Sequence, residues 1–317
     1  MEQKLDVRGM DAREVRARIR ENEYAGPTGG LAAGFAQANL VVLPGEYAFD
    51  FLKFCVRNPK PCPILEVTEA GSPEPVITAP GADLRTDVPR YRVYEHGEIV
   101  EEPKDLLHRW REDLVAFLIG CSFTFEAALI AAGLRIAHVE QDRNVPMYVT
   151  GKECVPSGPF GGPMVVSMRP YKPEEIPLVV SASGRYPAMH GAPVHVGDPE
   201  ALGIVDLANP EFGEPVEIEE DQLPVFWACG VTPQAIAMQA KPPLVITHSP
   251  GHMFITDRRH SEYEVAGLSP SAPTQENLCF AGKYADARKG PELRPTLLTV
   301  TGQLPDHPRA SPIAPAA

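Results

Sequence analysis

The stretch that decides the fold contains two segments, PVFWACGVTPQ at residues 224–234 and PLVITHSPGHMFITD at residues 243–257. In each segment an apolar run typical of a buried strand leads directly into a turn with reactive side chains. The first run ends at Cys229, and the second ends at His248, before a Ser-Pro-Gly turn that presents His252. Ligands of open α/β sheets bind in the crevice beyond the carboxyl ends of the strands. The two strand ends therefore predict one wall of an active site.

A helix is expected to follow the first of these strands, with Thr232 as its N-cap and Pro233 at the first helical position. Amides at such a helix start would lower the pKa of the Cys229 thiol or bind a substrate carboxylate. Gly230 and Thr232 are therefore predicted to take part in substrate binding. The alternative is structural, because free cysteines are among the most buried residue types and also suit tight turns.

Length, charge and cysteine usage limit the class of protein. The 317 residues suggest two domains, at about 150 residues each. A net charge of -13 without a basic block argues against nucleic acid and anionic membranes as partners. No stretch approaches the roughly 20 apolar residues that span a bilayer, and the first residues lack the apolar core of a secretory signal. Six cysteines without CxxC spacing indicate free thiols, so we expect a cytoplasmic protein. A homo-oligomer is left open.

Periodicity and turn residues predict an α/β fold. Short apolar runs predict strands, and apolar residues at helical spacing predict helices. The strands are expected at residues 40–43, 64–67, 91–94, 147–149, 164–168 and 193–196, and the helices at residues 47–55, 105–118, 123–132 and 173–183. Asp11 and Glu14 form a capping-box start for a further helix, and the segment from Glu95 to Glu98 suits a hairpin turn.

The order of these elements suggests two domains. Between residues 144 and 202 the order β-β-α-β fits a small two-layer α+β unit. We therefore predict a mixed-sheet α/β main domain at residues 1–143 and 203–265, with an inserted α+β domain at residues 144–202. Residues 266–317 are rich in proline and have no hydrophobic period, which predicts a flexible tail.

Cys121 has a setting similar to that of Cys229, with Gly120 before it and Ser122 as an expected N-cap. If both thiols face one cavity, they would act as an acid–base pair across a substrate carbon. The apolar residues around Cys121 favour a structural role instead. Glu126 follows a little further along the chain, and it either points to the same pocket or faces solvent.

Histidines and arginines complete the set of candidates. The histidines form two short-range pairs separated by turns that do not favour metal-ligand geometry, so we predict no metal site. Acid–base work or carboxylate recognition suits them better, and guanidinium groups are the usual bidentate partners of carboxylates. The candidates are His190, His195, His248 and His252, together with Arg169 and Arg185. Turn-capping histidines and surface salt bridges are the structural alternatives.

Several strings of the sequence resemble one known family. They are GPTGGLAAGFAQANLVVLP (26–44), FCVRNPKPCPILEVTE (54–69), LIGCSFTFEAAL (118–129), GPMVVSMRPY (162–171), HGAPVHVGDP (190–199), VFWACGVTPQA (225–235) and ITHSPGHMFITD (246–257). They resemble the bacterial "putative hydro-lyase" family, which is related to the catalytic part of D-glutamate cyclase, the enzyme that dehydrates D-glutamate to 5-oxo-D-proline. The resemblance covers roughly residues 8–260. It implies a carbon–oxygen lyase that acts on a small carboxylate or amino acid.

A mechanism follows as a hypothesis. Cyclising glutamate requires a deprotonated amine, a polarised γ-carboxyl group and release of water. His248 or His252 would take the amine proton, while the amides of residues 230–232 and Arg169 hold the developing oxyanion. Ring closure is intramolecular, so the protein mainly supplies orientation and charge stabilisation, and the chemistry demands no cofactor. The alternatives are a hydro-lyase for a small hydroxy acid and a non-catalytic binder of small carboxylates. The clustering of reactive groups at strand ends favours catalysis.

Overall fold

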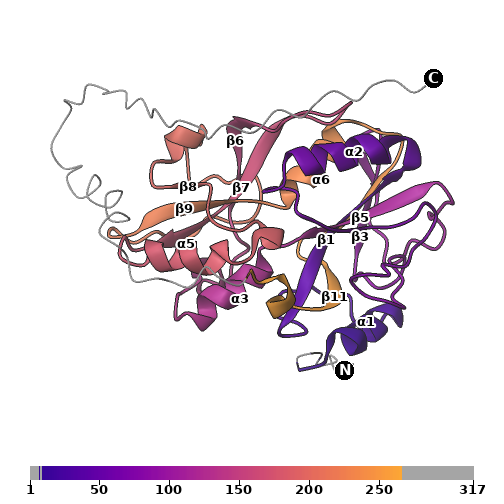
Figure 1. Ribbon diagram of the computed structural model, residues 1–317, viewed down its shortest axis with the longest axis horizontal. Helices are drawn as coiled ribbons and strands as arrows, with labels where there is room; N and C mark the ends of the chain where they lie inside the picture. Colours follow the sequence, from indigo (N-terminus) through magenta and orange to yellow (C-terminus); the bar gives the residue numbers. More distant parts are fainter. Residues whose placement is uncertain (1–6, 8, 266–317) are drawn as a thin grey trace, which may run out of the picture. The chain divides into compact units, whose positions relative to one another are not determined.

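The computed structural model describes Val7 and residues 9–265, which belong to one compact unit. The predicted tail at residues 266–317 lies outside the described residues. In the part of the chain that is described, no helix is both long and apolar enough to cross a membrane. Helices and strands are mixed along the chain, which confirms the α/β class (Figure 1).

The larger sheet is built around one long strand, β1 (Phe35–Pro44), all of whose residues except the first are buried. Within the described residues this sheet has seven strands in the order β2-β5-β1-β10-β3-β4, and β11 also pairs with β1. The other six strands are β2 (Ile64–Val67), β3 (Tyr91–Glu95), β4 (Glu98–Glu101), β5 (Leu114–Gly120), β10 (Val245–His248) and β11 (Phe254–Arg259). The predicted hairpin turn joins β3 to β4.

The direction of the neighbours of β1 determines where the site forms. Both β5 and β10 pair with β1 in antiparallel fashion, with Gly120 opposite Ala38 and Thr247 opposite Val41. They therefore run in the same direction as each other, and both end near the beginning of β1. Instead of the mixed sheet that we expected, the strand pairs of the described residues are antiparallel throughout. The strand ends meet because β1 separates two strands of equal direction.

The smaller sheet has the order β6-β7-β9-β8. Its strands are β6 (Met147–Glu153), β7 (Pro163–Tyr171), β8 (His195–Val196) and β9 (Leu223–Ala228). β9 lies beyond residue 202, so this sheet takes in chain that we had expected in the main domain. In Figure 1 the helices α3 and α5 lie beside this sheet, whereas α2 and α6 lie beside the larger one.

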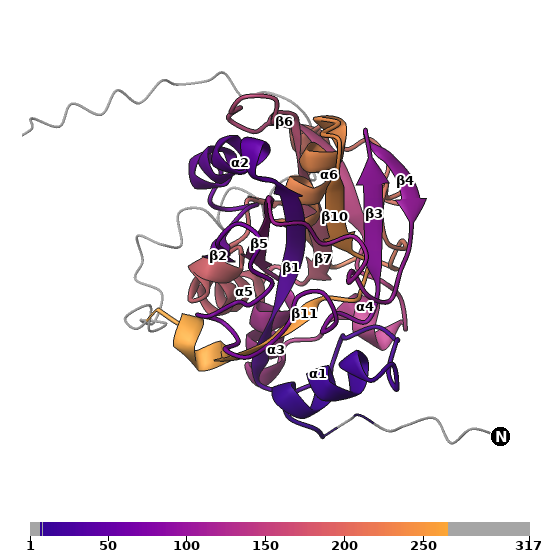
Figure 2. The ribbon, with the colours of Figure 1, turned by 90° about the vertical axis from the view of Figure 1, so that its right-hand side faces the viewer.

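Most of the helices form close to where their sequence patterns place them, but the short helix at residues 137–140 was not predicted. They are α1 (Ala12–Arg20), α2 (Gly45–Arg57), α3 (Phe123–Ala131), α4 (Ala137–Glu140), α5 (Ile176–Gly184) and α6 (Val231–Gln239), with short 3₁₀ turns η1 (Pro187–Met189), η2 (Pro199–Leu202) and η3 (His260–Tyr263). The capping box of Asp11 and Glu14 starts α1 as predicted. α1 packs against β11 at the lower end of the view in Figure 2.

The helix predicted at residues 105–118 is wrong. Residues 114–120 form β5, which is buried along its whole length and paired with β1 and β2. A continuous apolar run fits a strand covered on both faces, and periodicity alone cannot distinguish it from a buried helix. Leu106 and Trp110, which completed the helical pattern, sit in the turn before the strand and pack on the core of the larger sheet.

Candidate active site

Two strand–turn–helix units bring their cysteines together where the two sheets adjoin. In the larger sheet β5 leads into Cys121 and then into α3, and in the smaller sheet β9 leads into Cys229 and then into α6. The packing of α6 on β1 and β10 brings the second turn to the larger sheet. Cys229 and Arg169 both influence the pKa of Cys121 through their charge. We call the region around Cys121, Cys229 and Arg169 the cysteine seam.

Both thiols of the cysteine seam resist deprotonation. Burial raises the pKa of Cys121 to about 12, although the backbone amide of Phe123 acts in the opposite direction. Burial also raises the pKa of Cys229, against the effect of the amides of Val231 and Gly230 and the charge of Arg169. The expectation that the helix start lowers the pKa of Cys229 is therefore wrong, because the loss of hydration outweighs the amide contacts. At neutral pH both residues are proton donors.

Within the cysteine seam, the side chain of Arg169 is buried and surrounded by hydrogen-bond partners and aromatic rings. Only 1% of its surface is exposed. Its Nε donates to Oε1 of Glu126 at 3.0 Å, Nη1 donates to Ser167 Oγ at 3.0 Å, and Nη2 donates to Ser122 Oγ at 3.1 Å and also to Glu126. The rings of Phe125 and Trp227 lie 5.1 and 5.3 Å from the guanidinium carbon. The N–H groups of the guanidinium are thus occupied by protein acceptors. Arg169 acts on the two thiols through its charge and not through a hydrogen bond.

Glu126 faces inward and is 6% exposed, which resolves the two orientations left open above. Its Oε2 lies 3.8 Å from Nε2 of His138, a buried residue on α4. Burial lowers the pKa of His138 to about 4, so this imidazole is neutral at physiological pH. The negative charge of Glu126 is therefore balanced by Arg169. Ser122 contributes its hydroxyl to the same network and does not cap α3 through its side chain.

Asn39 on β1 bonds to the end of β5, contacts His248 and lies against Gly230. Its Nδ2 donates to the carbonyl of Gly120 at 2.9 Å, and its Oδ1 lies 3.1 Å from Nε2 of His248. A methyl group on Gly230 would overlap the Asn39 amide. Gly230 is therefore required for this close approach of the two sheets.

His248 and His252 differ in whether both of their ring nitrogens have hydrogen-bond partners. His248 is 5% exposed, with Nδ1 donating to the carbonyl of Ser249 at 2.7 Å and Nε2 accepting from Gln234 at 2.8 Å. Burial lowers its pKa to about 4. His252 is more exposed, and its Nδ1 donates to the carbonyl of Pro250 at 2.7 Å. Among the described residues Nε2 of His252 has no hydrogen-bond partner, so this atom is open to a ligand.

His190 lies near the cysteine seam in an unusual backbone conformation. It is 1% exposed, has φ of 74°, and its Nδ1 donates to the carbonyl of Lys60 at 2.8 Å. Burial lowers its pKa to about 4, with the charge of Arg169 acting in the same direction. Within the described chain its buried Nε2 has no hydrogen-bond partner.

Thr232 holds α6 in place from inside the helix. The helix begins at Val231, one residue before Thr232, so the predicted N-cap is wrong and Gly230 takes that position. The Thr232 hydroxyl donates to the carbonyl of Val165 at 3.1 Å and accepts from the amide of Val165 at 3.0 Å. Because both bonds go to the β7 backbone, the side chain anchors α6 on the smaller sheet.

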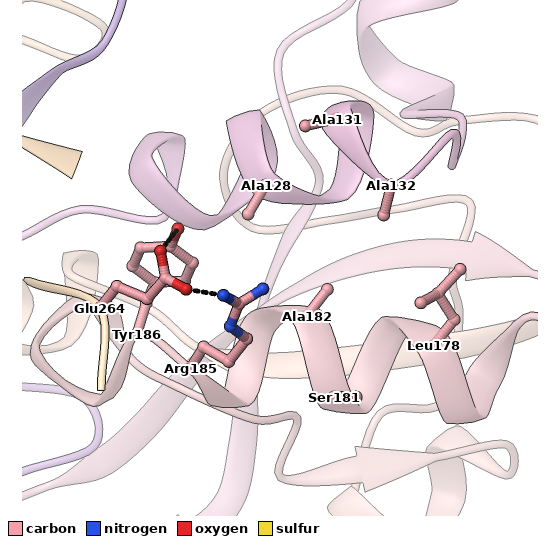
Figure 3. Close-up of a pocket in the computed structure, with 9 residues that line it drawn as sticks. All are labelled: Ala128, Ala131, Ala132, Leu178, Ser181, Ala182, Arg185, Tyr186 and Glu264. Atoms are coloured by element: carbon pink, nitrogen blue, oxygen red, sulfur yellow. Dashed lines mark hydrogen bonds and ion pairs between the residues drawn. The ribbon is translucent and has the colours of Figure 1, made fainter. Parts of the chain in front are cut away.

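The structure places His195 and Arg185 apart from the cysteine seam. His195 packs on Phe226, on the opposite face of the smaller sheet from Trp227 and Arg169. Arg185 forms an ion pair with Glu264 beside a groove of about 350 Å³ between α3 and α5 (Figure 3). Two alanines of α3 and the residue after it, Ala132, form one side of this groove, and Arg185 and Glu264 lie at its end.

Sequence reasoning missed Asn39 and Gln234 and left Glu126 unassigned. Asn39 had a usable signal, since it and Gln37 interrupt the apolar run of β1, where a buried amide needs a specific partner. Glu126 also had a signal, because it is the only charged residue of α3, whereas Gln234 lies in a helix of mixed character and only the packing reveals its contacts. Among the residues that the structure describes, no group of three or more His, Cys, Asp or Glu side chains is placed to hold a metal ion.

Comparisons with known proteins place the chain among its relatives. The family model for D-glutamate cyclase matches residues 115–257, which include both cysteines, Arg169, His248 and His252. A "Putative hydro-lyase" of Rubrobacter xylanophilus is 74% identical over 254 residues, covering 80% of this chain and 98% of the relative. Proteins of the same name from Stutzerimonas stutzeri and Bacillus licheniformis are 59% and 58% identical, covering 81% and 82% of this chain and 97% and 100% of the relatives.

Among solved structures, a nitrogen repressor-like protein from Methanococcus jannaschii aligns with 79% of this chain and 98% of its own. Its identity is 10% and its TM-score is 0.33, which is too low to support an inference. The sequence relatives are decisive, because their identity is high and they are covered almost completely. The chain therefore belongs to the bacterial hydro-lyase family that is related to D-glutamate cyclase.

Proposed function

We propose that the chain is a cofactor-independent carbon–oxygen lyase that dehydrates D-glutamate to 5-oxo-D-proline. The observation that supports this proposal is the cysteine seam itself, in which two protonated thiols and a buried cation lie close to Asn39, a residue that also contacts His248 at the start of the turn to His252. Family membership supports the reaction class. The free thiols of the described cysteines support a reducing compartment, which we take to be the cytoplasm.

The proton transfers can be assigned to particular atoms. The substrate ammonium group first passes one proton to the γ-carboxylate, which gives a neutral amine and a carboxylic acid. Nε2 of His252 then accepts a second proton from the amine nitrogen as this nitrogen attacks the γ-carboxyl carbon. The amides of Gly230 and Val231, which already face the sulfur of Cys229, stabilise the oxyanion that forms. As the carbon–oxygen bond breaks, Cys121 or Cys229 donates a proton to the departing hydroxide, and water leaves. The thiolate then recovers its proton from the imidazolium of His252.

The other predicted residues have supporting parts in this proposal. His248 holds the Ser249–His252 turn through its bond to the Ser249 carbonyl. Arg169 favours the transient thiolate by its charge, since it lowers the pKa of both cysteines against the effect of burial. His190 offers a neutral imidazole near the seam. Substrate contacts of His195 and Arg185 would require a ligand that reaches beyond the seam.

The test is to incubate the protein with D-glutamate or with 5-oxo-D-proline and follow interconversion by proton NMR. We expect turnover that falls by about 100-fold or more in His252→Gln, the lower range for general base catalysis. The control is His108→Gln, which removes an exposed histidine paired with Glu101. Turnover that survives in His252→Gln contradicts the role of His252. Activity on a hydroxy acid but not on D-glutamate would retain the lyase class and change the substrate.

A further inference from the structure

Arg90 differs from every other arginine in the described part of the chain. The others have a carboxylate, a carbonyl oxygen or an aromatic ring as a side-chain partner, as in Arg92 with Glu102, Arg57 with the Pro156 carbonyl and Arg259 over Phe35. Arg90 has none among the described residues. Its Nε is buried without a hydrogen-bond partner, while its two terminal nitrogens are not buried.

Two backbone contacts place Arg90 beside the turn of the candidate base. The carbonyl of Arg90 accepts from the amide of Ser249 at 2.8 Å. The Ser249 hydroxyl donates to the carbonyl of the next residue, Tyr91, at 3.1 Å. Ser249 opens the turn whose other end is His252, and the amide of His252 donates back to the Ser249 carbonyl at 2.9 Å. The root of the Arg90 side chain is therefore fixed relative to His252.

An unpaired arginine at this position calls for an explanation. A buried N–H without an acceptor is destabilising, and this chain offers 42 acidic residues against 29 basic ones. Arg169 has its fork occupied by Glu126, Ser122 and Ser167. Arg92, whose charge acts on His248, is paired with Glu102. The site therefore lacks a protein carboxylate for Arg90 and lacks a second arginine for a ligand carboxylate.

We propose that Arg90 binds a carboxylate of the substrate, with its planar fork supplying parallel N–H bonds. The inference rests on the proposed function, in which the α-carboxylate of D-glutamate is the acidic group that survives the reaction. Held by Arg90, this group positions the neighbouring amine close to His252. The product retains the same carboxylate, so substrate and product bind through the same residue.

The experiment compares binding of an acid and its amide by isothermal titration calorimetry. 5-Oxo-D-proline and 5-oxo-D-prolinamide differ only in the carboxylate. Arg90→Gln should weaken binding of the acid by about tenfold or more and leave binding of the amide unchanged. Arg90→Lys should retain part of the affinity for the acid. Arg57→Gln, which removes an exposed arginine bonded to a carbonyl oxygen, is the matched control.

Each outcome decides the inference. Equal affinity for the acid in Arg90→Gln and in the unaltered protein overturns it, and so does a parallel loss of the acid and the amide, which would indicate a structural role. If 5-oxo-D-proline does not bind, the same series is run with D-glutamate, succinate and glutarate. Failure of the unaltered protein to bind any of them also overturns it. Arg90-dependent binding without turnover would leave the inference standing and refute the proposed reaction.

A chemical measurement avoids dependence on the variants. Phenylglyoxal reacts with accessible guanidinium groups, and the two terminal nitrogens of Arg90 are not buried. We expect mass spectrometry to find Arg90 modified in the free protein and protected by the acids that bind. Modification of Arg90 at an unchanged rate in the presence of a bound acid contradicts the proposed contact.

Discussion

At the scale of single residues, the buried pair of Arg169 and Glu126 is the most sensitive point of the molecule. Removing one partner leaves an uncompensated charge in the interior, which typically costs about 3–5 kcal/mol. We expect Glu126→Gln to lower the free energy of unfolding by roughly that amount. The double variant Glu126→Gln with Arg169→Met should be less damaging than Glu126→Gln alone. Urea denaturation of the unaltered protein, both single variants and the double variant checks this, and a loss in the double variant equal to the sum of the two single losses would contradict it.

Three buried histidines make stability depend on pH. Burial lowers the pKa of His138, His190 and His248 to about 4 in each case, whereas unfolded imidazoles titrate near pH 6.5. Between these values the unfolded chain binds protons that the folded chain does not, so stability falls as the pH drops from about 6.5 towards 4. Each group should contribute about 2 kcal/mol of this loss by pH 5.

The measurement compares urea unfolding at pH 7 and pH 5. His138→Gln should lose less stability over this interval than the unaltered protein, because one of the three groups is absent. His108→Gln, which removes an exposed imidazole, should lose as much as the unaltered protein. The same loss in His138→Gln and the unaltered protein would show that His138 is not buried in its neutral form.

At the scale of elements, glycines at strand ends set how closely neighbouring segments approach. A methyl group on Gly120 at the end of β5 would overlap the carbonyl oxygen of Ala188, which is backbone and cannot swing away. We expect Gly120→Ala to destabilise the fold by about 1–3 kcal/mol and to reduce activity by displacing Cys121. Gly151→Ala in β6 is the control, because its methyl group would lie 3.7 Å from the nearest atom. Thermal unfolding distinguishes the two, and equal midpoints would contradict the close contact.

Sequence patterns identified most elements but not their partners. The apolar runs of β1, β2, β3 and β7 and the capping box of α1 carry local signals, and these elements form where predicted. The positions of Cys121 and Cys229 in turns after strands could also be predicted from the sequence. Whether the pKa of each thiol is raised or lowered could not be predicted, because it depends on how completely distant segments bury the sulfur. β5 was misassigned for a related reason, since coverage on both faces removes the alternation by which strands are recognised.

At the scale of the whole molecule, the two sheets share their hydrophobic core. Phe51 of α2 packs on Phe160 near the smaller sheet with ring centroids 5.1 Å apart, and Ala36 of β1 lies in one cluster with Trp227 of β9. The smaller sheet also includes β9, which lies outside the insert predicted at residues 144–202. Local patterns give no information on which sheet a strand joins.

Shared packing predicts a single cooperative unfolding transition for the described residues. The chain has two tryptophans, Trp110 on the core of the larger sheet and Trp227 in the smaller one. Trp110→Phe and Trp227→Phe each leave one fluorescent reporter. We expect the fluorescence of each variant to change at the same urea concentration as its own circular dichroism. Separate transitions in either variant would show that the sheets unfold independently.

The two cysteine-bearing turns belong to different sheets, and this has a consequence for how the family diverges. Each turn is fixed by its own sheet, so the gap between the thiols follows the distance between the sheets. Volume changes at remote positions such as Ala36 or Phe160 would widen or narrow that gap without altering any reactive group. Selection for a longer or shorter acid could therefore act through the core, and relatives with identical turns could differ in the substrates they accept.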